Sequence, residues 1–274
     1  MEILEKMLYG LLIGLSQILP VSSLAHSRIY GILSGMEEEP LWSLLAHIGI
    51  LAALLVHYSK RLRHMQREMQ IAGAKKHRRL RQPDMAAVSD YRVILTACIP
   101  MIAALVFGPI VTPYVDSLWA MALLLIVNGA MLYASQFLPD GNRQSLAMSP
   151  ADGFLFGLSS IAAFVPGLSR IGCKLFWGQR RGVDRAYMTD LVLLMTIPWV
   201  IGLLVLDIIA LFGGGITLSL VALVSALLCG GAAFGGAYGA AAFMQYLAVR
   251  IGFHAFAYYS WGAGFVCFIL YLMI

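Results

Sequence analysis

The chain has 274 residues, of which 60% are hydrophobic and only 12% charged, with a formal net charge of +5. This composition excludes a soluble globular domain and is typical of an integral membrane protein. The basic excess is concentrated in one polar segment, so it does not indicate binding to nucleic acid.

The first apolar segment, residues 8–33, is interrupted by Pro20, Ser22 and Ser23. Such a break frees backbone groups that lipid cannot satisfy, so it is tolerated only where protein or a water-filled cavity covers it. We therefore expect a re-entrant helical hairpin here, and no cleaved signal peptide, because no convincing cleavage site is present. A spanning helix is expected next, over residues 41–58.

Residues 59–92 form the long polar stretch of the chain and hold ten of its nineteen Lys and Arg residues. The positive-inside rule predicts a cytoplasmic loop, and a site for anionic lipid is the alternative. Two further spans are expected over residues 93–114 and 118–138. The polar residues 139–150 are expected to link two halves of the chain.

The second half, residues 151–274, follows the same plan. Residues 153–177 are apolar but broken in the middle, which predicts a second re-entrant hairpin. Three more spans are expected, over residues 187–212, 218–246 and 251–274.

The two predicted hairpins share a sequence pattern. Residues 10–16 and 153–159 both read Gly-x-Leu-x-Gly-Leu-Ser, and each copy leads to a proline followed by hydroxyl and basic residues. Broken apolar segments at matching places in two halves are typical of inverted-repeat membrane proteins. We therefore predict an all-α integral membrane protein with six transmembrane helices plus two re-entrant hairpins, in which residues 1–138 and 151–274 are inverted repeats. The hairpin tips are expected to meet near the midplane.

Polar residues from both hairpins would converge at this point. An anion-binding site is predicted because hydroxyls, cations and freed backbone N–H groups together suit phosphate oxygens. The candidate phosphate-binding residues are Ser22, Ser23, Gly167, Ser169, Arg170 and Lys174. In the alternative, Arg170 pairs with an internal carboxylate, Asp190 or Asp207, and no ligand is bound.

Two histidines lie in or near this polar cluster. His26 follows the first break and His47 lies inside the first span. Each is a candidate acid–base group, and the alternative for each is a hydrogen-bonded histidine in the membrane core. The cysteines lie apart in apolar sequence, no metal-ligand spacing is present, and no metal site is predicted.

These motifs resemble those of the undecaprenyl-diphosphate phosphatase (bacitracin-resistance) family of bacterial membrane enzymes. Its first motif is matched by Gly14, Ser16, Leu19, Pro20, Ser22, Ser23 and His26, and its second by Pro166, Gly167, Ser169 and Arg170. The resemblance implies the same fold and a multi-pass protein of the bacterial inner membrane. It also implies a hydrolase that removes the terminal phosphate of a polyprenyl diphosphate, reached from the outer side, and so recycles the carrier lipid for peptidoglycan and cell-wall synthesis.

The chain departs from the family pattern where the chemistry would lie. Ile13 and Gln17 stand at the acidic or amide positions of the first motif, Ile171 replaces a serine, and Lys174 replaces a threonine. His47 stands where the family tends to carry glutamine. The chain thus resembles a divergent member without the motif glutamates, and the Ca²⁺ or Mg²⁺ that the family implies would lack a carboxylate ligand.

Three hypotheses follow. The first is a phosphatase with rewired chemistry, in which His26 or His47 is the base or nucleophile and Ser23, Ser169 and Arg170 complete the catalytic set. The second is a catalytically impaired relative that binds or translocates a polyprenyl phosphate. The third is an inactive, regulatory or partner-binding membrane protein. The expected partners are the membrane and a polyprenyl phosphate or diphosphate lipid, not nucleic acid, and a homodimer is left open.

Overall fold

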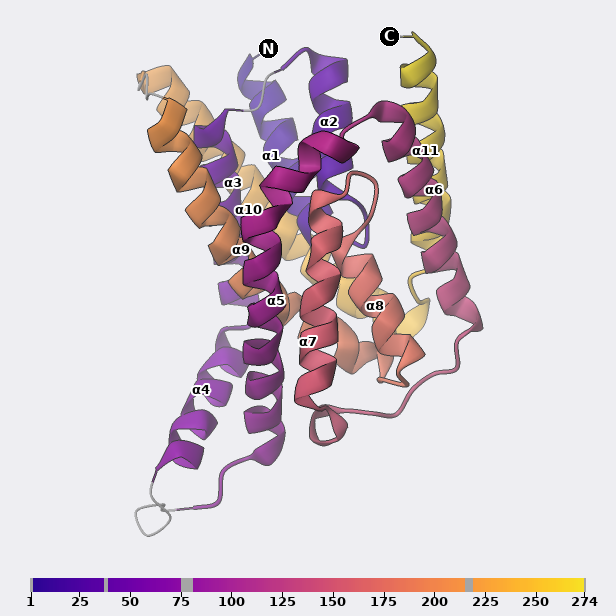
Figure 1. Cartoon of the computed structure of the whole chain (residues 1–274). Coiled ribbons are helices and arrows are strands. Elements are labelled where there is room, and N and C mark those ends of the chain that lie inside the picture. The colour runs from indigo at the N-terminus through magenta and orange to yellow at the C-terminus, as the bar shows by residue number, and fades with distance from the viewer. Residues whose placement is uncertain (1, 37–38, 75–80, 215–218, 274) are drawn as a thin grey trace.

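The protein is a bundle of helices (Figure 1), seen in a computed structural model that describes residues 2–36, 39–74, 81–214 and 219–273. Within these ranges it contains no strand beyond an isolated bridge between Arg143 and Val183. Six helices are long and apolar enough to cross a membrane: α3 (Pro40–His57), α5 (Met85–Val115), α6 (Leu118–Ala134, extended by the short helix η2, Ser135–Phe137), α9 (Arg185–Gly214), α10 (Leu220–Arg250) and α11 (Ala255–Met273). The prediction of an all-α integral membrane protein with six spans is confirmed.

The two interrupted segments form helical hairpins. In the first, α1 (Glu2–Ile18) ends just before Pro20, and α2 (Ser23–Ser34) returns alongside it. A proline has no N–H and restricts the residue before it, so α1 cannot continue through this point. In the second, α7 (Pro150–Leu158) continues as the 3₁₀ helix η4 (Ser159–Phe164), and α8 (Arg170–Arg180) returns. Figure 1 shows the first hairpin entering from the end that carries both termini and the second from the opposite end.

The segment expected to be a basic loop, residues 59–92, is instead largely helical. It contains α4 (Ser59–Gly73) and the first turns of α5, which begins at Met85 and not at residue 93. Residues 59–73 contain no proline, and α4 buries Met65 and Glu68. Glu68 accepts hydrogen bonds from the guanidinium of Arg81 and from the backbone N–H of Asp84, which holds the returning chain against α4.

Parts of several expected segments lie outside the described residues. They are Lys75, Lys76, Arg78 and Arg79 of the basic segment, the turn after Gly214, and the end residues of the spans expected over 218–246 and 251–274.

The glycines of the repeated motif let each hairpin approach a long helix closely. A Cβ atom on Gly14 would lie 2.3 Å from the carbonyl oxygen of Ala233 in α10, and one on Gly157 would lie 2.2 Å from that of Ala97 in α5. Both are far inside van der Waals contact, so only glycine fits. The first hairpin thus packs on a helix of the second half, and the second hairpin on a helix of the first half.

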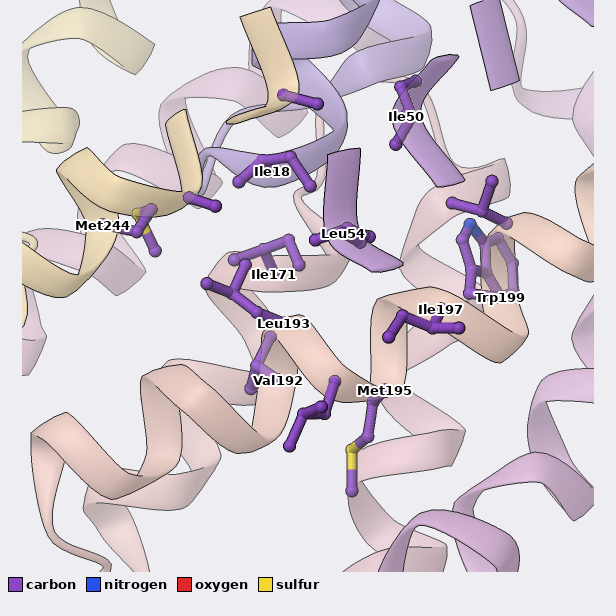
Figure 2. Packing of buried hydrophobic residues seen from close by; sticks show 14 of the residues in the cluster. Ile18, Ile50, Leu54, Ile171, Val192, Leu193, Met195, Ile197, Trp199 and Met244 are labelled. Atoms are coloured by element: carbon purple, nitrogen blue, oxygen red, sulfur yellow. The ribbon is translucent and has the colours of Figure 1, made fainter. Parts of the chain in front are cut away.

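Part of the hydrophobic core lies where the hairpin tips meet the first spans of the two halves, and the same core continues along α5 and α10. Figure 2 shows Ile18 and Ile171, from the ends of the two hairpin breaks, in one cluster with Ile50 and Leu54 of α3. Residues 192–199 of α9 complete this part of the cluster, which ends in the fully buried Trp199. The core therefore fixes the two hairpin tips relative to α3 and α9.

Candidate active site

A cavity of about 500 Å³ lies where the hairpin tips meet α3, α5 and α9. The first hairpin contributes residues on both sides of its break, and the second contributes the end of η4 and the start of α8. Apolar side chains such as Ile13, Ile171 and Trp199 form part of the wall. The polar residues that line the cavity are Ser16, Gln17, Ser23, Ser27, Arg28, Ser43, His47, Thr112, Asp116 and Arg170.

Two of the predicted phosphate ligands, Ser22 and Ser169, cap helices in this structure. The hydroxyl of Ser22 accepts from the N–H of Ala25 at the start of α2, and that of Ser169 accepts from the N–H of Gly172 at the start of α8, at 3.0 Å. Capping by serine satisfies N–H groups that the first turn of a helix leaves free. Ser22, Gly167 and Ser169 do not line the cavity. These serine hydroxyls thus bind backbone N–H groups at the two breaks, which the sequence alone could not show.

The two hairpin tips are tied together by polar groups of α6 and of the tips themselves. The side-chain amide of Asn128 in α6 donates to the carbonyl oxygen of Pro20 (3.4 Å), and its oxygen accepts from the backbone N–H of Ser169 (3.0 Å). Asn128 is fully buried and also donates to Ser260 of α11. An amide in the middle of an apolar span is a signal of a polar contact, and this signal could have identified Asn128 from the sequence.

Arg170 is the cation of the cavity. Its guanidinium donates to the hydroxyl of Thr196 (3.1 Å) and to the backbone oxygen of Gln17 (3.0 Å), and it lies 5.2 Å from the ring of Trp199. It is 5% exposed, and over the described part of the chain no carboxylate forms an ion pair with it. A charged side chain deep in a membrane protein costs about 3 kcal/mol on insertion scales, so an unpaired one favours an anionic ligand.

The carboxylates considered as partners for Arg170 are engaged elsewhere. Asp190 accepts from Arg61 (2.7 Å), Tyr58 (2.9 Å) and Gln245 (2.7 Å). Asp207 accepts from His47. The alternative in which Asp190 or Asp207 neutralises Arg170 is therefore wrong.

Of the two histidines, only His47 lines the cavity. Its Nδ1 lies 2.7 Å from a carboxylate oxygen of Asp207. His26 is buried between α2 and α11, and both of its ring nitrogens are engaged at 2.6 Å, by the carbonyl oxygen of Ser22 and by the hydroxyl of Tyr259. Tyr259 of α11 thus holds His26 in place.

Of the remaining candidate site residues, some line the cavity and others do not. Ser23 lines the cavity, and its oxygen accepts from the hydroxyl of Ser16 (3.1 Å). Lys174 is fully buried, but its ammonium donates to Ser160 of η4 (2.8 Å), and the residue does not border the cavity. Of these two cations, Arg170 therefore borders the cavity and Lys174 does not. Gln17 lines the cavity with its side-chain oxygen 3.4 Å from Arg170.

The donor set does not fit a resident divalent metal. Over the described residues, no group of three or more His, Cys, Asp or Glu side chains could hold an ion. Of the described residues that line the cavity, Asp116 carries the carboxylate, and it forms an ion pair with Arg28. Ca²⁺ and Mg²⁺ require several oxygen ligands, usually including carboxylates. The Ca²⁺ or Mg²⁺ implied by the resemblance has no protein site in these residues.

The fold and the cavity define a polytopic membrane protein that presents a buried arginine, hydroxyls and a histidine where two opposed hairpins meet. Over residues 6–266 the chain matches the family described as Bacitracin resistance protein BacA, and it belongs to that family.

Curated relatives match over most of the chain. It is 31% identical to Undecaprenyl-diphosphatase 2 of Frankia casuarinae, over 98% of this chain and 95% of that protein. It is 26% identical to an undecaprenyl-diphosphatase of Methanobrevibacter smithii, over 98% of this chain and 97% of that protein. A third relative, from a Nocardioides species, is 29% identical over 73% of each chain.

Proposed function

We propose that the protein is an undecaprenyl-diphosphatase-like phosphatase, which hydrolyses the terminal phosphoanhydride bond of a polyprenyl diphosphate and so returns the carrier lipid to cell-wall synthesis. The observation that carries the proposal is Arg170, a buried cation that borders the cavity between the hairpins and has no carboxylate partner among the described residues. A diphosphate supplies the missing negative charge, and a guanidinium stabilises the charge that develops on phosphoryl oxygens. The names of the relatives favour hydrolysis over binding or translocation alone.

The proposed substrate is amphipathic, and the surface beside the cavity suits its tail. A groove of about 410 Å³ runs between α5 and the second hairpin and is lined almost wholly by apolar residues, among them Phe107 and Leu158. Phe164 lines both this groove and the polar cavity. A lipid could therefore place its phosphates beside Arg170 and its first isoprene units along α5.

We further propose that residues 1–138 and 151–274 are inverted repeats in a bacterial inner membrane. The opposite entry of the two hairpins and the matched glycine contacts of Gly14 and Gly157 support this relationship. The positive-inside rule places the basic α4 end in the cytoplasm. The first hairpin and the ion pair of Arg28 with Asp116 at the cavity then face the outer side.

The proposal is tested by phosphate release from undecaprenyl diphosphate by the purified protein in detergent, with and without added Mg²⁺ or Ca²⁺. We expect release by the native chain and its loss in Arg170→Ala, with Arg67→Ala, on the exposed face of α4, as the control arginine. Size-exclusion profiles and helical content show whether each variant is folded. Absence of release from the native protein under all metal conditions would contradict the proposal.

A further inference from the structure

Three side chains from α3 and α9 form a hydrogen-bonded set at the cavity wall. The Nδ1 atom of His47 lies 2.7 Å from Oδ2 of Asp207, and the hydroxyl of Ser43 donates to Oδ1 of the same carboxylate at 2.8 Å. Ser43 and His47 are four residues apart on α3 and so lie on one face of that helix. Both residues line the cavity that also holds Arg170.

This arrangement fixes the tautomer of the imidazole. An ionised carboxylate can only accept, so Nδ1 of His47 carries the proton that it donates to Asp207. In the neutral ring Nε2 is then the nitrogen without a proton, and it is buried and has no hydrogen-bond partner among the described residues. Buried polar atoms in folded proteins nearly always have a partner. Because His47 lines the cavity, its partnerless basic nitrogen is a candidate to bind a water or substrate oxygen.

Resting on the proposed phosphatase function, we propose that His47 is the general base of the reaction, and that Asp207, itself held by Ser43, is its positioning residue. Nε2 takes a proton from a water molecule while the water oxygen bonds to the terminal phosphorus. The bond from that phosphorus to the bridging oxygen breaks, and its electron pair stays on the bridging oxygen of the polyprenyl monophosphate. The proton on His47 leaves with the released inorganic phosphate or to solvent.

Asp207 contributes in two ways. It keeps the imidazole in the tautomer that leaves Nε2 free, and its negative charge stabilises the imidazolium that forms when the proton is taken. The cavity residues at the acidic motif positions, Ile13 and Gln17, cannot act as a base of this kind. The His47–Asp207 pair, on α3 and α9, thus supplies the proton acceptor that those positions lack.

The test compares turnover with binding in His47→Ala, His47→Gln and Asp207→Asn, with His57→Gln as the matched control. His57 lies on the same helix but bonds Gln245 away from the cavity. Turnover is phosphate release from farnesyl diphosphate, and binding is the Kd of its non-hydrolysable methylene diphosphonate analogue. We expect kcat to fall by about 10²–10⁴-fold in both His47 variants, the usual loss of a general base, with a Kd close to that of the native protein. Asp207→Asn should lose kcat over a comparable range, because the asparagine amide can donate to Nδ1 and so favour the tautomer in which Nε2 carries the proton.

Rescue of turnover by added imidazole distinguishes a general base from a residue with only a structural role. Imidazole should restore turnover to His47→Ala, where the ring has been removed, and not to His47→Gln, where the amide fills the space. If the native protein turns over and the His47 variants turn over equally fast, or lose binding as much as kcat, the inference fails while the phosphatase proposal stands. If the native protein binds the analogue but releases no phosphate from the substrate, both fail.

Discussion

The hydroxyl of Ser22 in the first hairpin accepts a hydrogen bond from the backbone N–H of Gly167 in the second, with an N···O distance of 3.0 Å. The same oxygen accepts from the N–H of Ala25 and so caps α2. One buried hydroxyl thus caps the helix that follows the break in the first hairpin and also binds the backbone at the break in the second hairpin. The walls of the cavity depend on this junction, because both tips contribute to it.

Replacing Ser22 by Ala is therefore expected to destabilise the junction more than an ordinary serine replacement. The lost cap costs about 0.5–2 kcal/mol, and the N–H of Gly167, left buried without a partner, costs about 1–3 kcal/mol more. The midpoint of thermal unfolding in detergent measures the effect. Ser22→Thr should keep most of the stability, and Ser34→Ala, at an exposed position near the end of α2, is the control. Equal unfolding midpoints for Ser22→Ala and Ser34→Ala would contradict this account.

Replacing Gln17 by Glu tests whether the cavity works as a site of net positive charge. The side-chain oxygen of Gln17 lies 3.4 Å from the guanidinium of Arg170, so a carboxylate there would pair with the arginine and compete with the substrate. We expect the affinity for a non-hydrolysable diphosphate to fall by about tenfold or more, since a hydrogen bond to a charged group is worth about 1.5–3 kcal/mol. Gln66→Glu, on the exposed face of α4, controls for the added charge. A gain of phosphatase activity in Gln17→Glu would show instead that the chain had lost a needed acid.

Much of the architecture could be predicted from the sequence because lipid leaves few choices. The six apolar segments had to be helices, and the prolines and hydroxyls at Pro20 and Pro166 had to break two others. The ends of the helices were harder to predict in the charged segment, which lacks the apolar pattern of a membrane span. Residues 59–73 were expected to be a loop because they are polar. A polar segment without proline also forms a helix when one of its faces is buried, and in α4 that face carries Met65 and Glu68.

The candidate site was only partly predictable, since residue type does not reveal where a hydroxyl or ring nitrogen points. Arg170, Ser23 and His47 do line the cavity. Ser22 and Ser169 are caps, because the free backbone N–H groups at the start of α2 and α8 need hydrogen-bond acceptors. His26 is held by Tyr259. Asp207 was noted as a partner for some cation, but its pairing with His47 spans 160 positions of sequence, and only the packing of α3 on α9 shows it.

Asp152 anchors the second hairpin at its polar end, and its contribution should depend on pH. The carboxylate is fully buried and accepts from the backbone and hydroxyl of Ser149 (both 2.8 Å), from Arg143 (2.9 Å) and from Arg181. Burial acts to raise its pKa, but these hydrogen bonds outweigh it and lower the pKa from 3.8 to about 2. A lowered pKa means that the stabilisation is complete above about pH 4 and is lost as the pH falls toward 2.

Asp152→Asn should accordingly unfold at a clearly lower temperature than the native protein at pH 7, and the gap should narrow at pH 3 and below. The variant keeps the size of the side chain and removes only its charge. Asp140→Asn is the control, because Asp140 is largely exposed and pairs with Arg185 at the surface. A gap between Asp152→Asn and the native protein that stays constant from pH 7 to pH 2.5 would show that the charge of Asp152 does not matter.

The apolar groove on α5 gives a prediction about substrate length. Ala103 is an exposed residue of this groove, and a tryptophan there would fill the space proposed for the first isoprene units. We expect Ala103→Trp to raise KM for undecaprenyl diphosphate by about tenfold, since displacing two methylene groups at ~0.8 kcal/mol each is enough for that change. KM for geranyl diphosphate, whose chain is short, should change much less. Leu123→Trp, in the separate groove between α6 and α11, should affect neither substrate. If Leu123→Trp raised the KM of the long substrate and Ala103→Trp did not, the tail would lie along α6 and α11 instead of α5.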